Sequence, residues 1–318
     1  MKNTRIAMLL LIMFIMMGCS SSTSEKVYLF SYFTGNGQDG LHLAWSEDGL
    51  KWEALNKGES LLQPEIGKDK LMRDPCIIQG PDGRFHMVWT TGWWDQHIGY
   101  ASSDDLIHWS EQQIIPVMEH EPEAKNSWAP EVFYDEAAGE YFIFWATTIP
   151  GRHSEVAESE REKGLNHRMY ATKTKDFKNF EPTYLFFNPD FSVIDATILE
   201  HKHEFIMFVK NENPNPPEKN IRITRSSSAT GPYPTEVSEP ITGDYWAEGP
   251  TPLKVGNYVY VYFDKYRNHR YGAVRSSDME TWEDVSDSIS FPQGTRHGTA
   301  FTVDKKFFEK LIADLEMQ

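Results

Sequence analysis

Three acidic residues stand at the starts of sequence runs that are otherwise typical of buried β-strands. Asp74 precedes such a run at residues 76–78, Asp195 precedes one at 196–199, and Glu248 lies just before one at 252–255. Carboxylates that lie close together repel one another, so that one can hold a proton while another stays ionised. If the fold gathers these three residues, the sequence predicts acid–base chemistry.

Two further strand-like runs begin with an ionisable residue at the corresponding place. Glu131 follows Trp128-Ala129-Pro130, and His297 lies between Arg296 and Gly298. Five such starts, each with a polar group, predict that five equivalent strands present their first residues to one shared opening. A purely structural ring has little use for four acids at such a place.

A repeated motif indicates which elements carry these residues. It consists of Ser or Thr, any residue, Asp, three residues and an aromatic residue, and it occurs at 46–52, 103–109, 174–180 and 276–282. The Asp residues are 57, 71 and 102 residues apart, and a degenerate copy at 226–233 divides the longest gap. Ser and Asp favour turns because their side chains bond nearby backbone groups. Five units of this kind predict an all-β, five-bladed β-propeller.

The two ends of the chain predict how the ring closes. Residues 27–33, 41–45 and 52 onward supply three strands of a blade but no first strand, and residues 297–303 form a lone first strand. Pairing of the N-terminal and C-terminal strands would complete the fifth blade and remove exposed sheet edges. We therefore expect residues 27–318 to form a single domain that ends in a short surface helix at 305–317.

Five short words at the predicted strand starts resemble those of glycoside hydrolase family 43, and the likeness covers essentially the whole mature chain. The words are Asp74-Pro75, Trp128-Ala129-Pro130, Ile194-Asp195, Glu248-Gly249-Pro250 and Arg296-His297-Gly298. They occur in the family's order and in phase with the independent repeat. One departure is Ala196, where many members have Pro.

The resemblance implies a role for each catalytic carboxylate. Asp74 would be the general base that activates water, and Glu248 would be the general acid, which needs a raised pKa. Asp195 would raise that pKa and orient the acid. Direct attack by water inverts the anomeric centre and needs the acid and base about 6.5–9.5 Å apart. His297 would lie near a cation such as calcium, contacting it through water because calcium prefers oxygen ligands. The chemistry itself would require no cofactor.

Other side chains near the strand starts are predicted to bind the sugar. Aromatic rings suit sugar stacking, and polar groups would hold its hydroxyls. The predicted substrate contacts are Arg73, Trp93, Trp94, Trp128, Glu131, Tyr245, Trp246 and Arg296. Structural alternatives stay open: Asp74 could pair with Arg73, Asp195 or Glu248 could be a structural acid, Glu131 could brace the axis, and His297 could be a core residue.

The resemblance favours an exo-acting α-L-arabinofuranosidase, with β-xylosidase and galactose-releasing activities as alternatives and endo-acting arabinanase also open. A fructoside hydrolase shares an Arg-Asp-Pro word but needs Asn-Asp-Pro and Glu-Cys words, which are absent. A different class of function is a propeller that binds glycans without catalysis. Retention of all three carboxylates argues against that class.

The N-terminus predicts export and lipidation. Lys2 and Arg5 precede an apolar run at 6–17, followed by Gly18 and Cys19, which is typical of an export signal. The run is shorter than the ~20 residues needed to span a bilayer. Residues 16–19 resemble a bacterial lipoprotein signal, so we expect a signal peptide at 1–19, lipid on Cys19, a linker at 20–26 and location on the outer membrane, facing the periplasm or the cell surface.

Charge and cysteine content limit the partners. The net charge is −16, and loss of Lys2 and Arg5 would make it −18, which argues against nucleic acid. With Cys19 lipidated, Cys76 is the only other cysteine, so no internal disulfide is possible and a buried thiol is expected. The expected partners are an oligosaccharide or polysaccharide substrate and, through the lipid alone, a membrane. The protein is expected to be a monomer.

Overall fold

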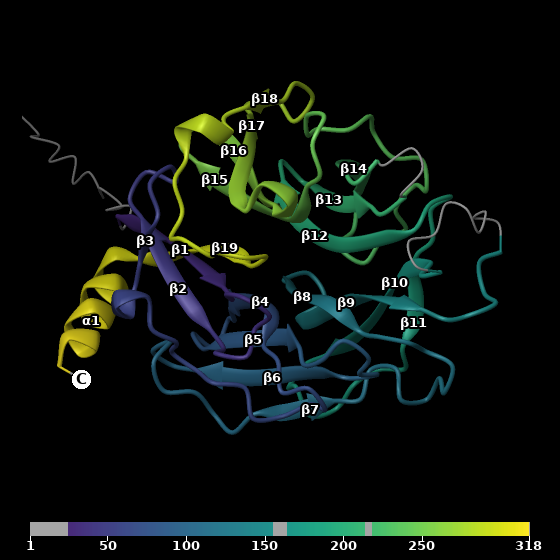
Figure 1. Ribbon diagram of the computed structural model, residues 1–318, viewed down its shortest axis with the longest axis horizontal. Coiled ribbons are helices and arrows are strands. Elements are labelled where there is room, and N and C mark those ends of the chain that lie inside the picture. The colour runs from purple at the N-terminus through teal and green to yellow at the C-terminus, as the bar shows by residue number, and fades with distance from the viewer. Residues whose placement is uncertain (1–24, 155–163, 214–217, 318) are drawn as a thin grey trace, which may run out of the picture.

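The computed structural model describes residues 25–154, 164–213 and 218–317, which form five β-sheets around a common axis (Figure 1). The predicted five-bladed β-propeller is therefore confirmed. The signal peptide, Cys19 and most of the linker lie outside the described residues.

Each blade is a meander of antiparallel strands. Blade one has β4 (Arg73–Gln79), β5 (Phe85–Thr90), β6 (Ile98–Ser103) and β7 (Gln113–Ile115). Blade two has β8 (Trp128–Asp135), β9 (Glu140–Thr148), β10 (His167–Thr174) and β11 (Tyr184–Phe187). Blade three has β12 (Val193–His201), β13 (Glu204–Asn211) and β14 (Ile221–Ser226). Blade four has β15 (Glu248–Val255), β16 (Tyr258–Lys265), β17 (Arg270–Ser276) and β18 (Glu283–Asp284).

Blade five is assembled from both ends of the chain, as predicted. Its strand order is β19 (Thr299–Asp304), β1 (Lys26–Tyr32), β2 (His42–Ser46) and β3 (Glu53–Ala54). Strands β1 and β19 are antiparallel, with Cα partners from Lys26↔Asp304 to Ser31↔Thr299. This pairing closes the ring and places β1 between β19 and β2, so that β1 is not left as a sheet edge. Helix α1 (Lys305–Glu316) follows β19 and buries Phe308 and Leu311 against blade five.

The repeated motif forms the turn after the third strand of a blade, and its Asp organises that turn. In the first copy, Oδ1 of Asp48 accepts bonds from the backbone N–H groups of Leu50 (2.7 Å) and Lys51 (2.9 Å). The Asp residues at 105, 176 and 278 make the same pair of bonds. The shared geometry explains why the motif repeats so closely.

Blade three lacks the fourth strand that the sequence predicts. Its degenerate turn contains a cis peptide bond between Gly231 and Pro232. Beyond it, the described residues 233–247 make two backbone bonds to β14, from Ser238 N to Ile223 O and from Ile241 N to Ile221 O. Irregular chain therefore covers the outer edge of this blade.

The core lies between neighbouring blades. Each adjacent pair encloses one cluster of buried apolar residues, such as Val88, Ile143 and Trp145 between blades one and two. Packing on both faces of every sheet holds the inner strands rigidly around the axis. Within the described ranges, no helix has the length and apolar character needed to cross a membrane.

Candidate active site

The first strand of four blades begins with the same irregularity. The register with the second strand shifts within residues 73–76, 128–131, 194–197 and 248–251. In each case the second residue has a left-handed backbone, with φ of 51° at Asp74, 46° at Ala129, 53° at Asp195 and 61° at Gly249. Positive φ strains a residue other than Gly, and Asp tolerates it better than most. A bulge that recurs at one end of the axis is a device for re-aiming side chains.

Asp74 projects toward the axis from blade one, and both of its carboxylate oxygens have a protein partner. Thr90 Oγ1 donates to Oδ2 over 2.8 Å, while the backbone N–H of Ala129 donates to that hydroxyl. His297 Nδ1 lies 3.3 Å from Oδ1. Although burial opposes ionisation, His297, Arg73 and Thr90 together lower the pKa of Asp74 to about 2. The structure thus holds Asp74 as a stable carboxylate.

His297 lies among three carboxylates near the axis. Burial disfavours its protonation, but the charges of Asp195, Asp74 and Glu248 raise its pKa to about 9. A side chain on residue 249 would collide with this ring, because a Cβ there would come within 2.3 Å of His297 Cδ2. Close packing against His297 and the positive φ together explain the glycine of the Glu-Gly-Pro word.

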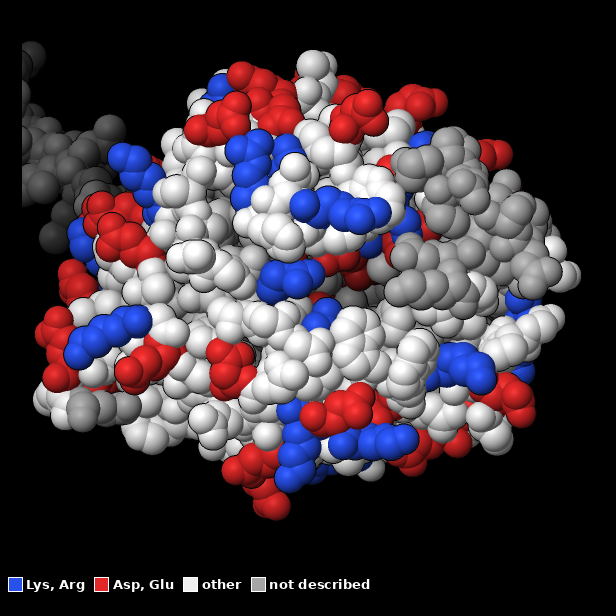
Figure 2. Space-filling view, in the orientation of Figure 1, with Lys and Arg blue, Asp and Glu red and all other residues white. Residues whose placement is uncertain are grey.

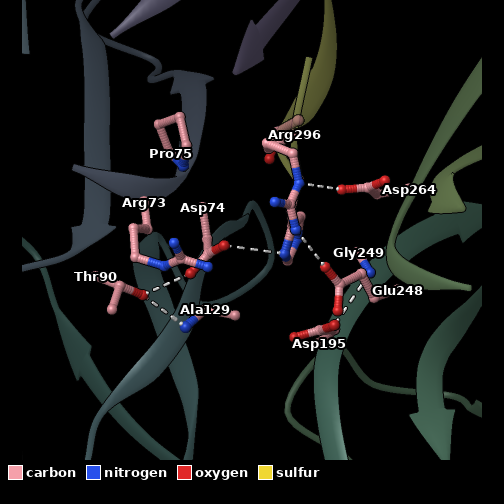
Figure 3. Close-up of polar contacts among 12 residues, drawn as sticks. Arg73, Asp74, Pro75, Thr90, Ala129, Asp195, Glu248, Gly249, Asp264 and Arg296 are labelled. Atoms are coloured by element: carbon pink, nitrogen blue, oxygen red, sulfur yellow. Dashed lines mark hydrogen bonds and ion pairs between the residues drawn. The ribbon is translucent and has the colours of Figure 1, made fainter. Parts of the chain in front are cut away.

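Asp195 and Glu248 face Asp74 from the other side of the axis (Figure 3). The Oδ2 of Asp195 accepts a bond from Gly249 N over 3.1 Å, which ties blade three to blade four. Burial raises the pKa of Asp195 to about 6, and the neighbouring carboxylates Glu248 and Asp74 add to the rise. The three predicted catalytic carboxylates therefore meet at one end of the axis.

Two cations hold the carboxylate of Glu248. Lys210 Nζ lies 3.2 Å from Oε2, and Arg296 Nη2 lies 3.2 Å from Oε1. Burial favours the neutral acid, but these cations and His297 outweigh it and lower the pKa of Glu248. This differs from the raised pKa predicted for the acid, because that prediction did not include Lys210.

Arg296 joins Glu248 to a fourth acid, Asp264. Its Nε donates to Asp264 Oδ2 over 2.6 Å, so one guanidinium bridges two carboxylates (Figure 3). Burial and the charge of Glu248 raise the pKa of Asp264 to about 6. The role of Arg296 as a sugar contact stays a prediction. In the structure its guanidinium binds the carboxylates of Glu248 and Asp264.

The structure adds three residues that sequence reasoning missed: Thr90, Lys210 and Asp264. All come from the last residues of second strands, and they lie across the sheet from the first-strand words. Thr90 pairs with Arg73, Lys210 with Ile194, and Asp264 with Glu248. For Lys210 and Asp264 the available signal was a charged residue next to the end of a largely apolar second strand.

Comparison with known proteins agrees with this arrangement. Residues 24–309 match a family described as a probable glycosyl hydrolase domain, related to glycoside hydrolase family 43. The chain belongs to this family. The match spans every blade, so the whole propeller is the glycosyl hydrolase domain.

Individual relatives of this glycosyl hydrolase domain are distant. An α-L-arabinofuranosidase of Bifidobacterium longum subsp. longum is 23% identical over 259 residues, covering 69% of this chain but only 24% of that protein. The chain thus spans about a quarter of that relative's length. The structure of an α-L-arabinofuranosidase from Lactobacillus brevis has a TM-score of 0.52 at 17% identity and covers 67% of this chain and 72% of that one. An exo-β-1,3-galactanase from Phanerochaete chrysosporium, solved with galactose, has a TM-score of 0.51 at 13% identity and covers 72% and 51%. These two structures show likeness of fold alone.

The mouth of the hydrolase domain is hollowed, with acidic atoms at its depth and basic side chains around it (Figure 2). On one side, Trp93, Trp94 and Trp128 pack together, with ring centroids 5.7 and 5.8 Å from that of Trp128. Trp94 is 57% exposed, and the guanidinium of Arg73 lies 4.4 Å from the Trp93 ring. On blade four, Trp246 packs against Tyr266 and Arg267. These exposed or half-buried rings are available for stacking.

Two predicted sugar contacts of the hydrolase domain lie elsewhere. Tyr245 packs within blade four, where its ring stacks on Phe263 and its hydroxyl donates to Asp284 over 2.7 Å. Glu131 is buried, and its oxygens accept bonds from three protein side chains. Both side chains have protein partners for their polar groups, and the three bonds of Glu131 agree with the alternative that it braces the axis. Their role as sugar contacts stays a prediction.

The contacts and charge of His297 bear on the cation predicted for this domain. A protonated imidazole has no lone pair for a metal or for the hydrogen of a metal-bound water, and this ring already contacts Asp74. Across the described parts of the chain, no three His, Cys, Asp or Glu residues are grouped to hold a metal ion. Calcium binding stays a prediction and has no part in the mechanism below.

Proposed function

We propose that the protein is an inverting, exo-acting glycoside hydrolase that releases a terminal sugar from plant or other complex polysaccharides. The observation that carries the proposal is the placement of carboxylates of opposite character on two sides of one axis. The pKa of Asp74 is lowered to about 2 on one side, and on the other side burial raises the pKa of Asp195, which lies beside Glu248, to about 6. Pairs of carboxyl groups whose pKa values are pushed apart are typical of acid–base catalysis.

Asp74 acts as the general base. Each of its oxygens has a single protein partner and keeps a lone pair for water. Thr90 and His297 fix the orientation of the carboxylate, so that its proton-accepting lone pairs face a water positioned against the anomeric carbon. As the water attacks, its proton passes to Asp74. The imidazolium of His297 offsets the negative charges of the neighbouring carboxylates.

Glu248 acts as the general acid and delivers a proton to the leaving oxygen. In the structure Lys210 and Arg296 lower the pKa of Glu248, whereas burial raises the pKa of the neighbouring Asp195 to about 6, so the proton resides first on Asp195. A sugar that enters between Glu248 and either of its two cations weakens the ion pair and shifts the proton toward Glu248. Substrate binding therefore protonates Glu248 and makes it able to act as the general acid.

The terminal sugar is proposed to be α-L-arabinofuranose. The relative from Bifidobacterium longum is an α-L-arabinofuranosidase, which supports this choice. Xylose and galactose in either ring form are the alternatives within the same fold. The proposed platform for the sugar is formed by Trp93, Trp94, Trp128 and Trp246, with Arg73 and Arg296 as polar contacts.

A panel of aryl glycosides tests the proposal against a binding-only propeller. Arabinofuranosides, xylosides, galactopyranosides and galactofuranosides would be assayed with the wild-type protein and with Asp74→Asn. Asn tolerates the positive φ at this position, so the variant should fold. Turnover of one glycoside by the wild type alone supports the proposal. Glycan binding without turnover of any glycoside would place the protein in the non-catalytic class.

We also propose that the protein is exported and anchored to the outer membrane by lipid on Cys19, and that it is a monomer. The basic start, short apolar run and Gly-Cys pair support the anchor. Location at a membrane that meets external glycans suits a polysaccharide substrate.

A further inference from the structure

Beneath the catalytic carboxylates lies a second layer of side chains around the axis. We call the residues at 74, 129, 195, 249 and 297, one from each blade, the catalytic layer. Each member of the second layer follows a residue of the catalytic layer by two positions. The layer consists of Cys76, Glu131, Thr197, Thr251 and Thr299. All five are buried. Glu131 is the only ionisable acid among them, and the mechanism above does not use it.

Glu131 is bonded to three other blades. Its Oε2 accepts from Thr197 Oγ1 over 3.1 Å and from Cys76 Sγ over 3.4 Å, and its Oε1 accepts from Thr299 Oγ1 over 3.3 Å. One carboxylate therefore ties blade two to blades one, three and five.

The three donors lie on the same blades as residues of the catalytic layer, two positions further along the chain. Cys76 follows Asp74 by two positions, Thr197 follows Asp195, and Thr299 follows His297. Through these bonds Glu131 contacts the three strands at whose starts Asp74, Asp195 and His297 lie. Thr251 lies in the same layer, but its hydroxyl accepts a bond from Ala300 N over 2.8 Å and is not among the described hydrogen-bond donors to Glu131.

The charges of Glu131 and His297 also favour this arrangement. Burial raises the pKa of Glu131 to about 7, while the charge of His297 and the three donors favour its ionised form. Asp74, Asp195 and Glu248 face His297 from above, and Glu131 adds negative charge from below. A carboxylate at this depth is costly unless it is bonded on several sides, which matches the three donors.

We propose that Glu131 is a positioning residue, which sets the relative placement of Asp74, Asp195 and His297 by binding the three strands beneath them. This inference rests on the proposed function for its kinetic consequence only, because the placement of His297 can be measured without any substrate.

The test compares Glu131→Gln with Thr251→Val. The Gln side chain keeps the volume and one acceptor oxygen but loses the charge, whereas Thr251→Val changes a residue of the same layer that donates no hydrogen bond to Glu131. For Glu131→Gln we expect kcat to fall roughly 10–100-fold with KM little changed, since small misplacements of reacting groups have effects of this size. We also expect the ¹⁵N and ¹H resonances of the His297 ring to shift. Thr251→Val should keep the wild-type kcat and His297 resonances.

Unshifted His297 resonances in Glu131→Gln, or the same shifts in Thr251→Val, would overturn the proposal. If the protein hydrolyses none of the glycosides, the resonances alone decide, so failure of the proposed function is distinguishable from failure of this inference. Should Glu131→Gln not fold, Thr197→Val and Thr299→Val each remove one donor. Both should then shift the His297 resonances, and an unshifted spectrum in both would contradict the inference.

Discussion

The ammonium of Lys210 lies 3.2 Å from Oε2 of Glu248, and the side chains are only 2% and 20% exposed. Lys210 also contacts Glu212 over 2.8 Å, so its charge is shared between two acids. This cation keeps the proposed catalytic acid ionised in the structure. A substitution of Lys210 therefore tests how the protonation of Glu248 is controlled.

Lys210→Met should raise the pKa of Glu248, because burial would then be opposed by Arg296 and His297 alone. We expect the alkaline limb of the pH profile of kcat/KM to move to higher pH. Loss of a buried ion-pair partner should also lower the free energy of unfolding by about 3–5 kcal/mol. Lys173→Met is the matched control, since Lys173 pairs with Glu140 on blade two, away from the mouth. An alkaline limb that stays in place would refute the role of Lys210.

Glu248→Ala and Asp195→Ala should separate the acid from its partner. A phenol of low pKa leaves without a proton, so Glu248→Ala should hydrolyse such aryl glycosides nearly as well as the wild type. On natural glycans it should lose roughly 10²–10⁴-fold in kcat, the usual contribution of general acid catalysis. Asp195→Ala should show a smaller difference between the two substrate types. If the rescue appears for Asp195→Ala instead, Asp195 is the acid.

Stability should depend on pH through the Asp74–His297 pair. The folded-state pKa of Asp74, about 2, lies below its ordinary value of 3.8, so its contribution is present above pH 3.8 and lost as the pH falls through 2. The folded-state pKa of His297, about 9, lies above 6.5, so its contribution is complete below pH 6.5 and lost as the pH rises through 9.

Asp74→Asn removes the acid side of this dependence. Relative to the wild type, the variant should lack about 2 kcal/mol of the decline in unfolding free energy between pH 4 and pH 2, by the usual linkage. Chemical denaturation at a series of pH values measures the difference. Asp244→Asn, a change at an exposed loop residue, serves as the control. Parallel curves for wild type and Asp74→Asn would show that the pair does not form.

Membrane attachment should depend on Cys19. We expect Cys19→Ala to leave the membrane fraction after expression in a bacterium that processes lipoproteins, while Ser20→Ala remains there. Fractionation followed by immunoblotting measures both. A Cys19→Ala protein that stays with the membrane would show that the apolar run at 6–17, rather than lipid, provides the anchor.

The fold was predictable because each blade repeats a local pattern. The Ser-x-Asp turns report on backbone geometry that the chain reuses, and the unequal ends of the sequence indicate the pairing of β1 with β19. The missing fourth strand of blade three was not predictable, since its degenerate turn still resembled the others.

The residues of the candidate active site were predictable only where they lie at the start of a blade's first strand. Asp74, Asp195 and Glu248 stand in short words that can be read along the chain. Lys210 and Asp264 reach the same place by cross-strand register, which a single sequence does not display. The charge of Lys210, together with those of Arg296 and His297, reverses the expected pKa direction of Glu248, so the electrostatics of the acid could not be derived from the words alone.

The anomeric form of the first sugar released tests the central claim most directly. With Asp74 as a base that activates water across the axis from Glu248, attack comes from the face opposite the leaving group. Proton magnetic resonance, recorded before the product mutarotates, should therefore show the anomer inverted relative to the substrate. A product that first appears with retained configuration would contradict the account, because Asp74 would then attack the sugar itself.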